Sequence, residues 1–286
     1  MKCNVRRLAP AGLTIVMLLS FASGLNASST ERAPPAAKGS LYVGGTGAAT
    51  GILKILVKAY ERHHPLVKTV VYPSLGSGGG VKALVADKLT VSFSSRELKE
   101  EELQRGLIAT RLFRTPLVIA THPAIEISAI TSDQVANILS GEMTHWGNGA
   151  LARPVLRPLK DADTQILMDM SDNLRQAMLT AHKRTGKNVA ATDSDAADDL
   201  ASIKGAIGVT SLILLRAENR RINILRLDGV APTLKNLNSG KYPIGKTIYA
   251  IEKPTNSALA KSFLTYLQTD EARAIIVKYG GIVGDY

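Results

Sequence analysis

Two glycine-rich segments that lie within one predicted βαβ repeat constrain the fold of this chain most. The first covers 44–51 (GGTGAATG) and the second covers 76–80 (GSGGG). Each follows a short apolar run and precedes an amphipathic one, which predicts a strand, a tight glycine turn and a helix start, twice in succession. Glycine permits close approach of a ligand, and free N–H groups at a helix start attract anions. The pair therefore predicts an anion-binding site.

The amino-terminal residues have the pattern of a secretory signal peptide. A basic segment is followed by an apolar stretch over 8–25, and small residues allow cleavage after Gly24 or Ala27. An uncleaved membrane anchor is the alternative, but the apolar stretch is short and has no basic residues directly after it. We therefore expect a signal peptide over 1–27 and a periplasmic location for the mature chain. Residues 28–38, rich in proline, alanine and serine, are expected to form a flexible leader.

The composition excludes several classes of function. The single cysteine, Cys3, lies in the predicted signal peptide, so the mature chain would contain no disulfide, catalytic thiol or cysteine-bound zinc. The net charge is +11 for the whole chain and +8 without the three basic residues of the signal peptide. A basic surface concentrates anions. Aromatic residues are few and do not alternate with basic ones, so we expect no nucleic-acid partner.

Strand and helix patterns alternate along most of the chain, which favours an α/β fold with a parallel or mixed sheet covered on both faces. Thr50 is the expected N-cap of the helix that follows the first glycine segment. A second region begins near residue 122. In it, Thr131 or Ser132 is expected to cap a helix that stops at Gly141.

The order of motifs resembles the substrate-binding proteins of ABC importers, specifically the phosphate-binding branch. The resemblance covers nearly the whole mature chain, and its order and spacing are more specific than any single piece. The matching segments are 45–50, 75–82, 93–96, 131–141, 145–146, 205–209, 242–244 and 272–281.

The resemblance implies an α/β fold of the two-lobed periplasmic-binding-protein clamp, type II. Each lobe would be a mixed sheet flanked by helices, and two crossover strands, near 113–119 and 244–250, would join the lobes. Lobe I would comprise 39–116 and 249–286, and lobe II would comprise 117–248. The ligand would bind between them.

The same resemblance implies a solute-binding protein that captures a small tetrahedral oxyanion for import. Phosphate is the first candidate, and sulfate or another oxyanion is an alternative. An ABC permease would be the partner. We expect a monomer with no catalytic residue, no cofactor and no bound metal.

Ligand contacts implied by the resemblance come from four segments. They are the Thr50 hydroxyl with the Gly51 N–H, the Ser77 hydroxyl with the Gly78 N–H, Ser94 and Ser95, and Arg157 with Thr164.

The sequence departs from the family pattern at two places. The segment 94–96 (SSR) lies where the phosphate branch often has an aspartate, so Arg96 is expected to modify selectivity. In 157–164 (RPLKDADT), Ala162 and Asp163 replace a Ser-Gly pair. Asp163 would cap the next helix and place a carboxylate near the anion, unless it points away or pairs with Lys160 or Arg96. These alternatives leave the ligand open.

Two other functions remain as alternatives. The departures favour an extracytoplasmic sensor or interaction module that is uncoupled from transport and binds another small ligand. A short-chain-dehydrogenase-like enzyme is suggested by 46–52 and by Tyr242 and Lys246 in a Tyr-x-x-x-Lys pattern, but Leu53 replaces the last glycine of that motif. The acidic segment 193–199 lacks the EF-hand glycine and glutamate, so we expect a helix cap with a solvated face there rather than a calcium site.

Overall fold

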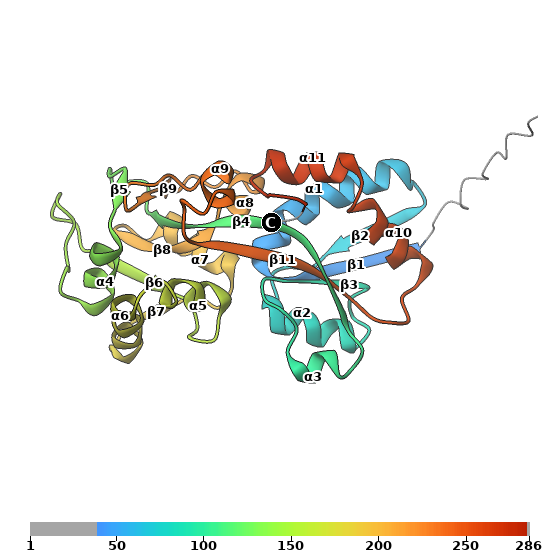
Figure 1. Cartoon of the computed structure of the whole chain (residues 1–286), viewed down its shortest axis with the longest axis horizontal. Coiled ribbons are helices and arrows are strands. Elements are labelled where there is room, and N and C mark those ends of the chain that lie inside the picture. Colours follow the sequence, from blue (N-terminus) through green and yellow to red (C-terminus); the bar gives the residue numbers. More distant parts are fainter. Residues whose placement is uncertain (1–38, 285–286) are drawn as a thin grey trace, which may run out of the picture. The chain divides into compact units, whose positions relative to one another are not determined.

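Strands and helices alternate along the chain in the computed structural model, which describes residues 39–284 (Figure 1). The predicted signal peptide and leader lie outside the described residues. The strands are β1 (Gly39–Gly45), β2 (Val67–Val71), β3 (Val91–Ser94), β4 (Ile108–Thr121), β5 (Ala129–Ile130), β6 (Arg153–Leu156), β7 (Asn188–Val189), β8 (Ala206–Ser211), β9 (Asn223–Ile224), β10 (Arg226–Leu227) and β11 (Gly245–Glu252).

The helices are α1 (Gly47–His63), α2 (Gly76–Val85), α3 (Glu100–Leu103), α4 (Ser132–Ser140), α5 (Ala162–Met168), α6 (Asp172–Lys183), α7 (Asp193–Ser202), α8 (Leu212–Ala217), α9 (Leu234–Asn238), α10 (Ala258–Tyr266) and α11 (Asp270–Lys278). Within residues 39–284, none of these helices combines the length and the apolar character that a membrane span requires.

Strand β4 connects the two halves of the main sheet, whose order is β2-β1-β3-β11-β4-β8-β6-β7 with β9 also on β4. Its first part, up to Pro116, pairs antiparallel with β11, and its second part, from Leu117 to Thr121, pairs antiparallel with β8. Strand β11 in turn pairs with β3. The strands expected near 113–119 and 244–250 are therefore present as β4 and β11. Their antiparallel pairing joins the half of the sheet that contains β1–β3 to the half that contains β6–β8.

Each half of the sheet has helices on both faces, and we call the half with β1–β3 lobe I and the half with β6–β8 lobe II. In lobe I, α1, α10 and α11 pack on one face, and α2 packs on the other. In lobe II, α4, α5 and α6 cover one face, and α7 and α8 cover the other. Helix α8 also contacts α1, and Ile213 joins the core of lobe I. The apolar side chains therefore form separate cores. Helix α1 of lobe I also packs against the side of lobe II that carries α7 and α8.

Most of the first glycine segment and all of the second are helical, which corrects the expectation of two glycine turns; Gly44 and Gly45 end β1. Helix α1 begins at Gly47 with Thr46 as its N-cap residue, four residues before the predicted cap, so Thr50 is not the cap. Helix α2 contains the whole second segment. A Cβ atom on Gly80 would lie 2.6 Å from the Gly45 Cα and 2.5 Å from the Ser92 Oγ. These glycines therefore allow α2 to pack directly onto β1 and β3.

Helix α4 follows the sequence prediction at both ends. The Thr131 side chain accepts a hydrogen bond from the Gln134 N–H, and the Gln134 side chain completes a capping box. The helix ends at Gly141, whose φ of 90° lies in the left-handed region. Residues close in sequence therefore determine where this helix begins and where it ends.

Candidate functional site

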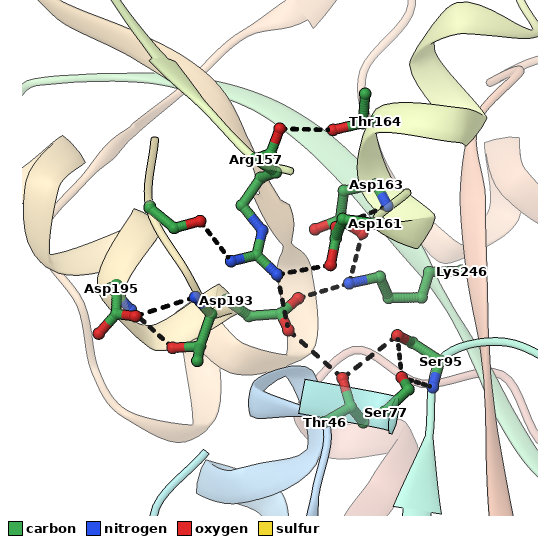
Figure 2. A network of polar contacts seen from close by, with 12 residues as sticks. Thr46, Ser77, Ser95, Arg157, Asp161, Asp163, Thr164, Asp193, Asp195 and Lys246 are labelled. Atoms are coloured by element: carbon green, nitrogen blue, oxygen red, sulfur yellow. Dashed lines mark hydrogen bonds and ion pairs between the residues drawn. The ribbon is translucent and has the colours of Figure 1, made fainter. Parts of the chain in front are cut away.

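Three hydroxyl side chains meet at the starts of α1 and α2 in lobe I (Figure 2). The Thr46 and Ser95 hydroxyl oxygens lie 3.2 Å apart, and the Ser77 and Ser95 hydroxyl oxygens lie 3.1 Å apart. The backbone N–H of Ser95 donates to the Ser77 Oγ at 3.0 Å. Ser95 follows the end of β3, so one strand and two helix starts position this uncharged group. We call it the hydroxyl cluster.

Arg157 faces this cluster from the end of β6 in lobe II, and its side chain is buried. Its Nη2 donates to the Asp161 carboxylate at 2.7 Å and lies 3.7 Å from the Asp193 Oδ2. Its Nη1 donates to the Ala190 backbone carbonyl at 3.0 Å. Arg157 is therefore held by partners from lobe II on both sides of its guanidinium.

Lys246 is a second buried cation, contributed by the crossover strand β11 (Figure 2). Its ammonium group forms ion pairs with Asp163 and with the Asp193 Oδ1, the latter at 2.5 Å. Burying an ammonium without partners is costly, and these two carboxylates offset that cost. The sequence signal for this role is a charged residue near the start of a strand whose later residues, 248–251, are apolar.

Asp193, the first residue of α7, joins the charged group to the hydroxyl cluster. Its Oδ2 accepts a hydrogen bond from the Thr46 hydroxyl at 3.3 Å, and only 3% of the residue is exposed. The charged group thus contains two cations and three aspartates, which we call the ionic cluster: Arg157, Lys246, Asp161, Asp163 and Asp193.

The protonation of the ionic cluster follows from its burial and its pairing. Burial raises the pKa of Asp163 to about 7, because desolvation outweighs the attraction of Lys246. Burial also opposes the charge on Asp193, but Lys246 and Arg157 lower the pKa of Asp193 well below its usual range. The ammonium of Lys246 loses solvation as well, but the two aspartates raise its pKa. With Asp163 protonated, two positive and two negative charges remain and the cluster is neutral.

Of the expected ligand residues, Ser77, Ser95, Arg157 and Asp163 come together here. Ser94 and Thr164 also lie nearby, but their hydroxyls donate to backbone carbonyls: Ser94 to Arg96 at 2.7 Å and Thr164 to Arg157 at 3.2 Å. Both residues are buried. Their hydroxyls therefore hold loops in place in this structure.

Arg96 and Asp163 do not pair with each other. Arg96 forms a two-pronged ion pair with Glu102, with both N–O distances at 2.8 Å, and Gly78 lies beside it in α2. Asp163 pairs with Lys246, a partner that was not among the expected ones. The cap of α5 is Asp161, whose side chain accepts from the Asp163 N–H at 3.0 Å, so the helix starts two residues earlier than the sequence suggested.

Thr50 and Gly51 lie apart from the hydroxyl cluster, on the first turns of α1. They line a pocket of about 680 Å³ between α1, the start of α7 and the end of α8. The other lining residues carry hydroxyls and charges of both signs, among them Lys54, Ser74, Thr192, Ser194, Asp195, Glu218 and Arg220. The pocket is therefore polar and is larger than an inorganic oxyanion needs.

Sequence reasoning missed Thr46, Asp161, Asp193 and Lys246. The acidic segment 193–199 was expected to cap a helix and to form a solvated face. Asp195 completes the capping box with Thr192 and is exposed, but for Asp193 the expectation is wrong, because Asp193 points into the ionic cluster. Among the described residues, no group of histidine, cysteine or acidic side chains has an arrangement that could hold a metal ion.

The Tyr-x-x-x-Lys pattern does not form a catalytic pair. The Tyr242 hydroxyl is buried and donates to the Leu117 backbone carbonyl at 2.9 Å, whereas Lys246 is bound by two aspartates. This hydrogen bond therefore links the segment that precedes β11 to strand β4. Both residues that suggested a dehydrogenase have structural partners instead.

Comparisons with known proteins place this arrangement in a family. A family model described as the PBP superfamily domain matches residues 30–271. The phosphate-binding protein PstS of Borreliella burgdorferi is 23% identical over 245 residues, covering 83% of this chain and 88% of the relative. PstS of Bacillus subtilis is 23% identical over 265 residues, covering 90% and 84%.

The fold agrees with this match. A crystal structure of a Clostridium perfringens protein with bound phosphate superposes with a TM-score of 0.72. It is 20% identical, and the alignment covers 86% of this chain and 100% of that one. The fold is the two-lobed type II periplasmic-binding-protein clamp expected from the motif order. Since the family model spans most of the sequence, the chain belongs to the PBP superfamily.

Proposed function

We propose that this protein is an extracytoplasmic solute-binding protein that captures a small tetrahedral oxyanion, with phosphate as the first candidate. It delivers the anion to an ABC permease and carries out no catalytic step. The relatives named as phosphate-binding proteins support this assignment, and so does the similar structure that contains phosphate. The signal-peptide pattern supports export, which cell fractionation and amino-terminal sequencing of the mature protein would test.

The observation that carries the proposal is the convergence of three hydroxyls at two helix starts, opposite two buried cations. Thr46, Ser77 and Ser95 supply neutral donors, and Arg157 and Lys246 supply positive charge. An oxyanion that leaves water needs such donors to replace its hydration shell. The hydroxyl cluster is therefore the proposed binding surface of lobe I.

Isothermal titration of the purified chain with phosphate, sulfate and molybdate tests the proposal. Binding of phosphate with a saturable heat and a rise in melting temperature is expected. Replacing Ser77 with alanine should weaken binding by about 10- to 100-fold, because a hydrogen bond to a charged group contributes about 1.5–3 kcal/mol. Replacing the exposed Ser40 of the same lobe should leave binding unchanged. A folded protein with no heat and no thermal shift for any tetrahedral anion would contradict the proposal.

A second candidate is a receptor or sensor, uncoupled from transport, that binds another small ligand. Two observations favour it: three aspartates surround two cations, and the polar pocket beside α1 has a volume of about 680 Å³. A thermal-shift screen that includes small phosphorylated and zwitterionic compounds separates the two candidates. The second is favoured if one of these compounds stabilises the protein and inorganic oxyanions do not.

A further inference from the structure

Asp193 has a different position from the other two aspartates of the ionic cluster. Lys246 pairs with Asp163, and Arg157 pairs with Asp161, so each cation already has a carboxylate of its own. Asp193 is the third carboxylate, shared between both cations. Asp161 and Asp163 could neutralise the two cations by themselves if Asp163 ionised, so Asp193 is not the only carboxylate available for this role.

Asp193 is also not needed to cap its helix. Thr192 accepts the hydrogen bond from the Asp195 N–H, and the Asp195 side chain accepts from the Thr192 N–H at 2.9 Å. A capping box of this kind satisfies the start of α7 by itself. The Asp193 side chain instead contacts Lys246 of β11, Arg157 and, in lobe I, Thr46.

The partners of Asp193 are the donors proposed for the ligand. Its two oxygens contact the Thr46 hydroxyl at 3.3 Å, the Lys246 ammonium at 2.5 Å and the Arg157 guanidinium at 3.7 Å (Figure 2). A hydroxyl at a helix start and two cations form a typical set of donors for an oxyanion. The carboxylate thus makes the contacts that an oxyanion ligand would make.

The backbone that carries Asp193 lies close to the first turn of α1. A Cβ atom on Gly47, at the first turn of α1, would lie 3.0 Å from the Asp193 Cβ and 3.1 Å from the Ser194 backbone nitrogen. The start of α7 therefore packs directly on the start of α1. A tetrahedral anion bound to the Thr46 hydroxyl and to both cations would take the place of the Asp193 carboxylate.

From these contacts we infer that Asp193 is an internal ligand that holds the two lobes together without solute, and that an oxyanion binds only by displacing it. This inference rests on the proposed function. A protein whose binding-competent form is only partly populated shows an apparent affinity reduced by that fraction. Asp193 would thereby set the solute concentration at which the protein responds.

Titration with inorganic phosphate tests the inference on the whole chain. Asp193→Asn should bind phosphate at least about tenfold more tightly than the wild type, because the competing charge is gone and the competent form is more populated. Asp198→Asn is the matched control, since it removes a carboxylate from an exposed position of the same helix and should bind as the wild type does. If Asp193→Asn folds and binds phosphate equally or more weakly, the inference is wrong and the proposed function stands.

A second variant and a second measurement guard against a folding defect. Asp193→Ser is smaller and also removes the charge, so it should tighten binding in the same direction. Small-angle scattering of the wild type should give the same radius of gyration with and without phosphate, because Asp193 already joins the lobes. A clear contraction of the wild type on adding phosphate would overturn the inference. If the wild type and both variants fold but bind neither phosphate, sulfate nor molybdate, the proposed function itself fails, and the inference fails with it.

Discussion

The hydroxyl cluster of lobe I and the ionic cluster face each other, but they are built in different ways. The hydroxyl cluster is uncharged, lies at two helix starts and depends on glycine for close packing. The ionic cluster joins lobe II to β11 through buried charges that neutralise one another. Under the proposed function, the first would supply the surface for an oxyanion, and the second would control whether the anion can enter. We therefore propose that ligand choice in this protein depends on the aspartates.

The largest expected effect comes from removing the cation that both lobes share. Lys246→Met should lower the free energy of unfolding by about 3–5 kcal/mol, because it leaves two buried carboxylates without that partner. Urea unfolding measures this, with the exposed Lys241→Met as the control, expected within about 0.5 kcal/mol of the wild type. A loss of less than about 1 kcal/mol would show that the ionic cluster contributes little to the fold.

The next effect is a dependence of stability on pH that belongs to Asp163. Its pKa is about 7 when folded against an ordinary value of 3.8, so between about pH 4 and 7 the folded form keeps a proton that the unfolded chain releases. This contribution is full below pH 4 and is lost as the pH rises to about 7. Each pKa unit corresponds to about 1.4 kcal/mol, so the loss is on the order of a few kcal/mol.

Asp163→Asn should abolish this part of the decline, since the amide cannot ionise. Urea unfolding at pH 4.5 and 7.5 compares the variant with the wild type, and Asp172→Asn, at an exposed position in α6, should retain the decline. An Asp163→Asn protein that loses as much stability over this range as the wild type would contradict the assignment of the proton.

A smaller effect concerns the packing beneath the hydroxyl cluster. Gly80→Ala should lower stability by about 1–3 kcal/mol, because its Cβ would overlap β1 and the Ser92 side chain. Gly78→Ala, in the same helix, has its nearest neighbour 4.0 Å away and should be neutral or stabilising by up to about 1 kcal/mol. Thermal unfolding of the pair checks the prediction. Equal melting temperatures would mean that α2 can shift away from the sheet.

The smallest effect on stability is expected at the contact between the two clusters. Thr46→Val removes the hydroxyl that donates to Asp193 and should cost about 1 kcal/mol of unfolding free energy. Thr46→Ser keeps the hydroxyl and should restore most of that loss. Urea unfolding of the three proteins measures both changes. If Thr46→Val lowered the unfolding free energy as much as Lys246→Met does, the hydroxyl cluster would contribute as much to stability as the ionic cluster.

Local sequence patterns predicted the elements of the fold and part of the site. Helix α4 has its cap and its glycine stop where Thr131 and Gly141 indicated, and β4 and β11 lie at the expected crossovers. Ser77, Ser95 and Arg157 come together as the motif order implied. These features depend on residues close in sequence, or on a motif spacing that the family model also matches.

The sequence alone therefore determined the fold class, most of its strands and helices, and two members of the hydroxyl cluster, Ser77 and Ser95. Only the tertiary structure decided that Asp163 and Asp193 pair with Lys246 and that Asp193 reaches Thr46. The physical reason is that a buried charge takes whichever opposite charge the folded chain brings near it, from strands and helices far apart in sequence. Propensity and periodicity describe each element, but they carry no information about which charges meet when two lobes close.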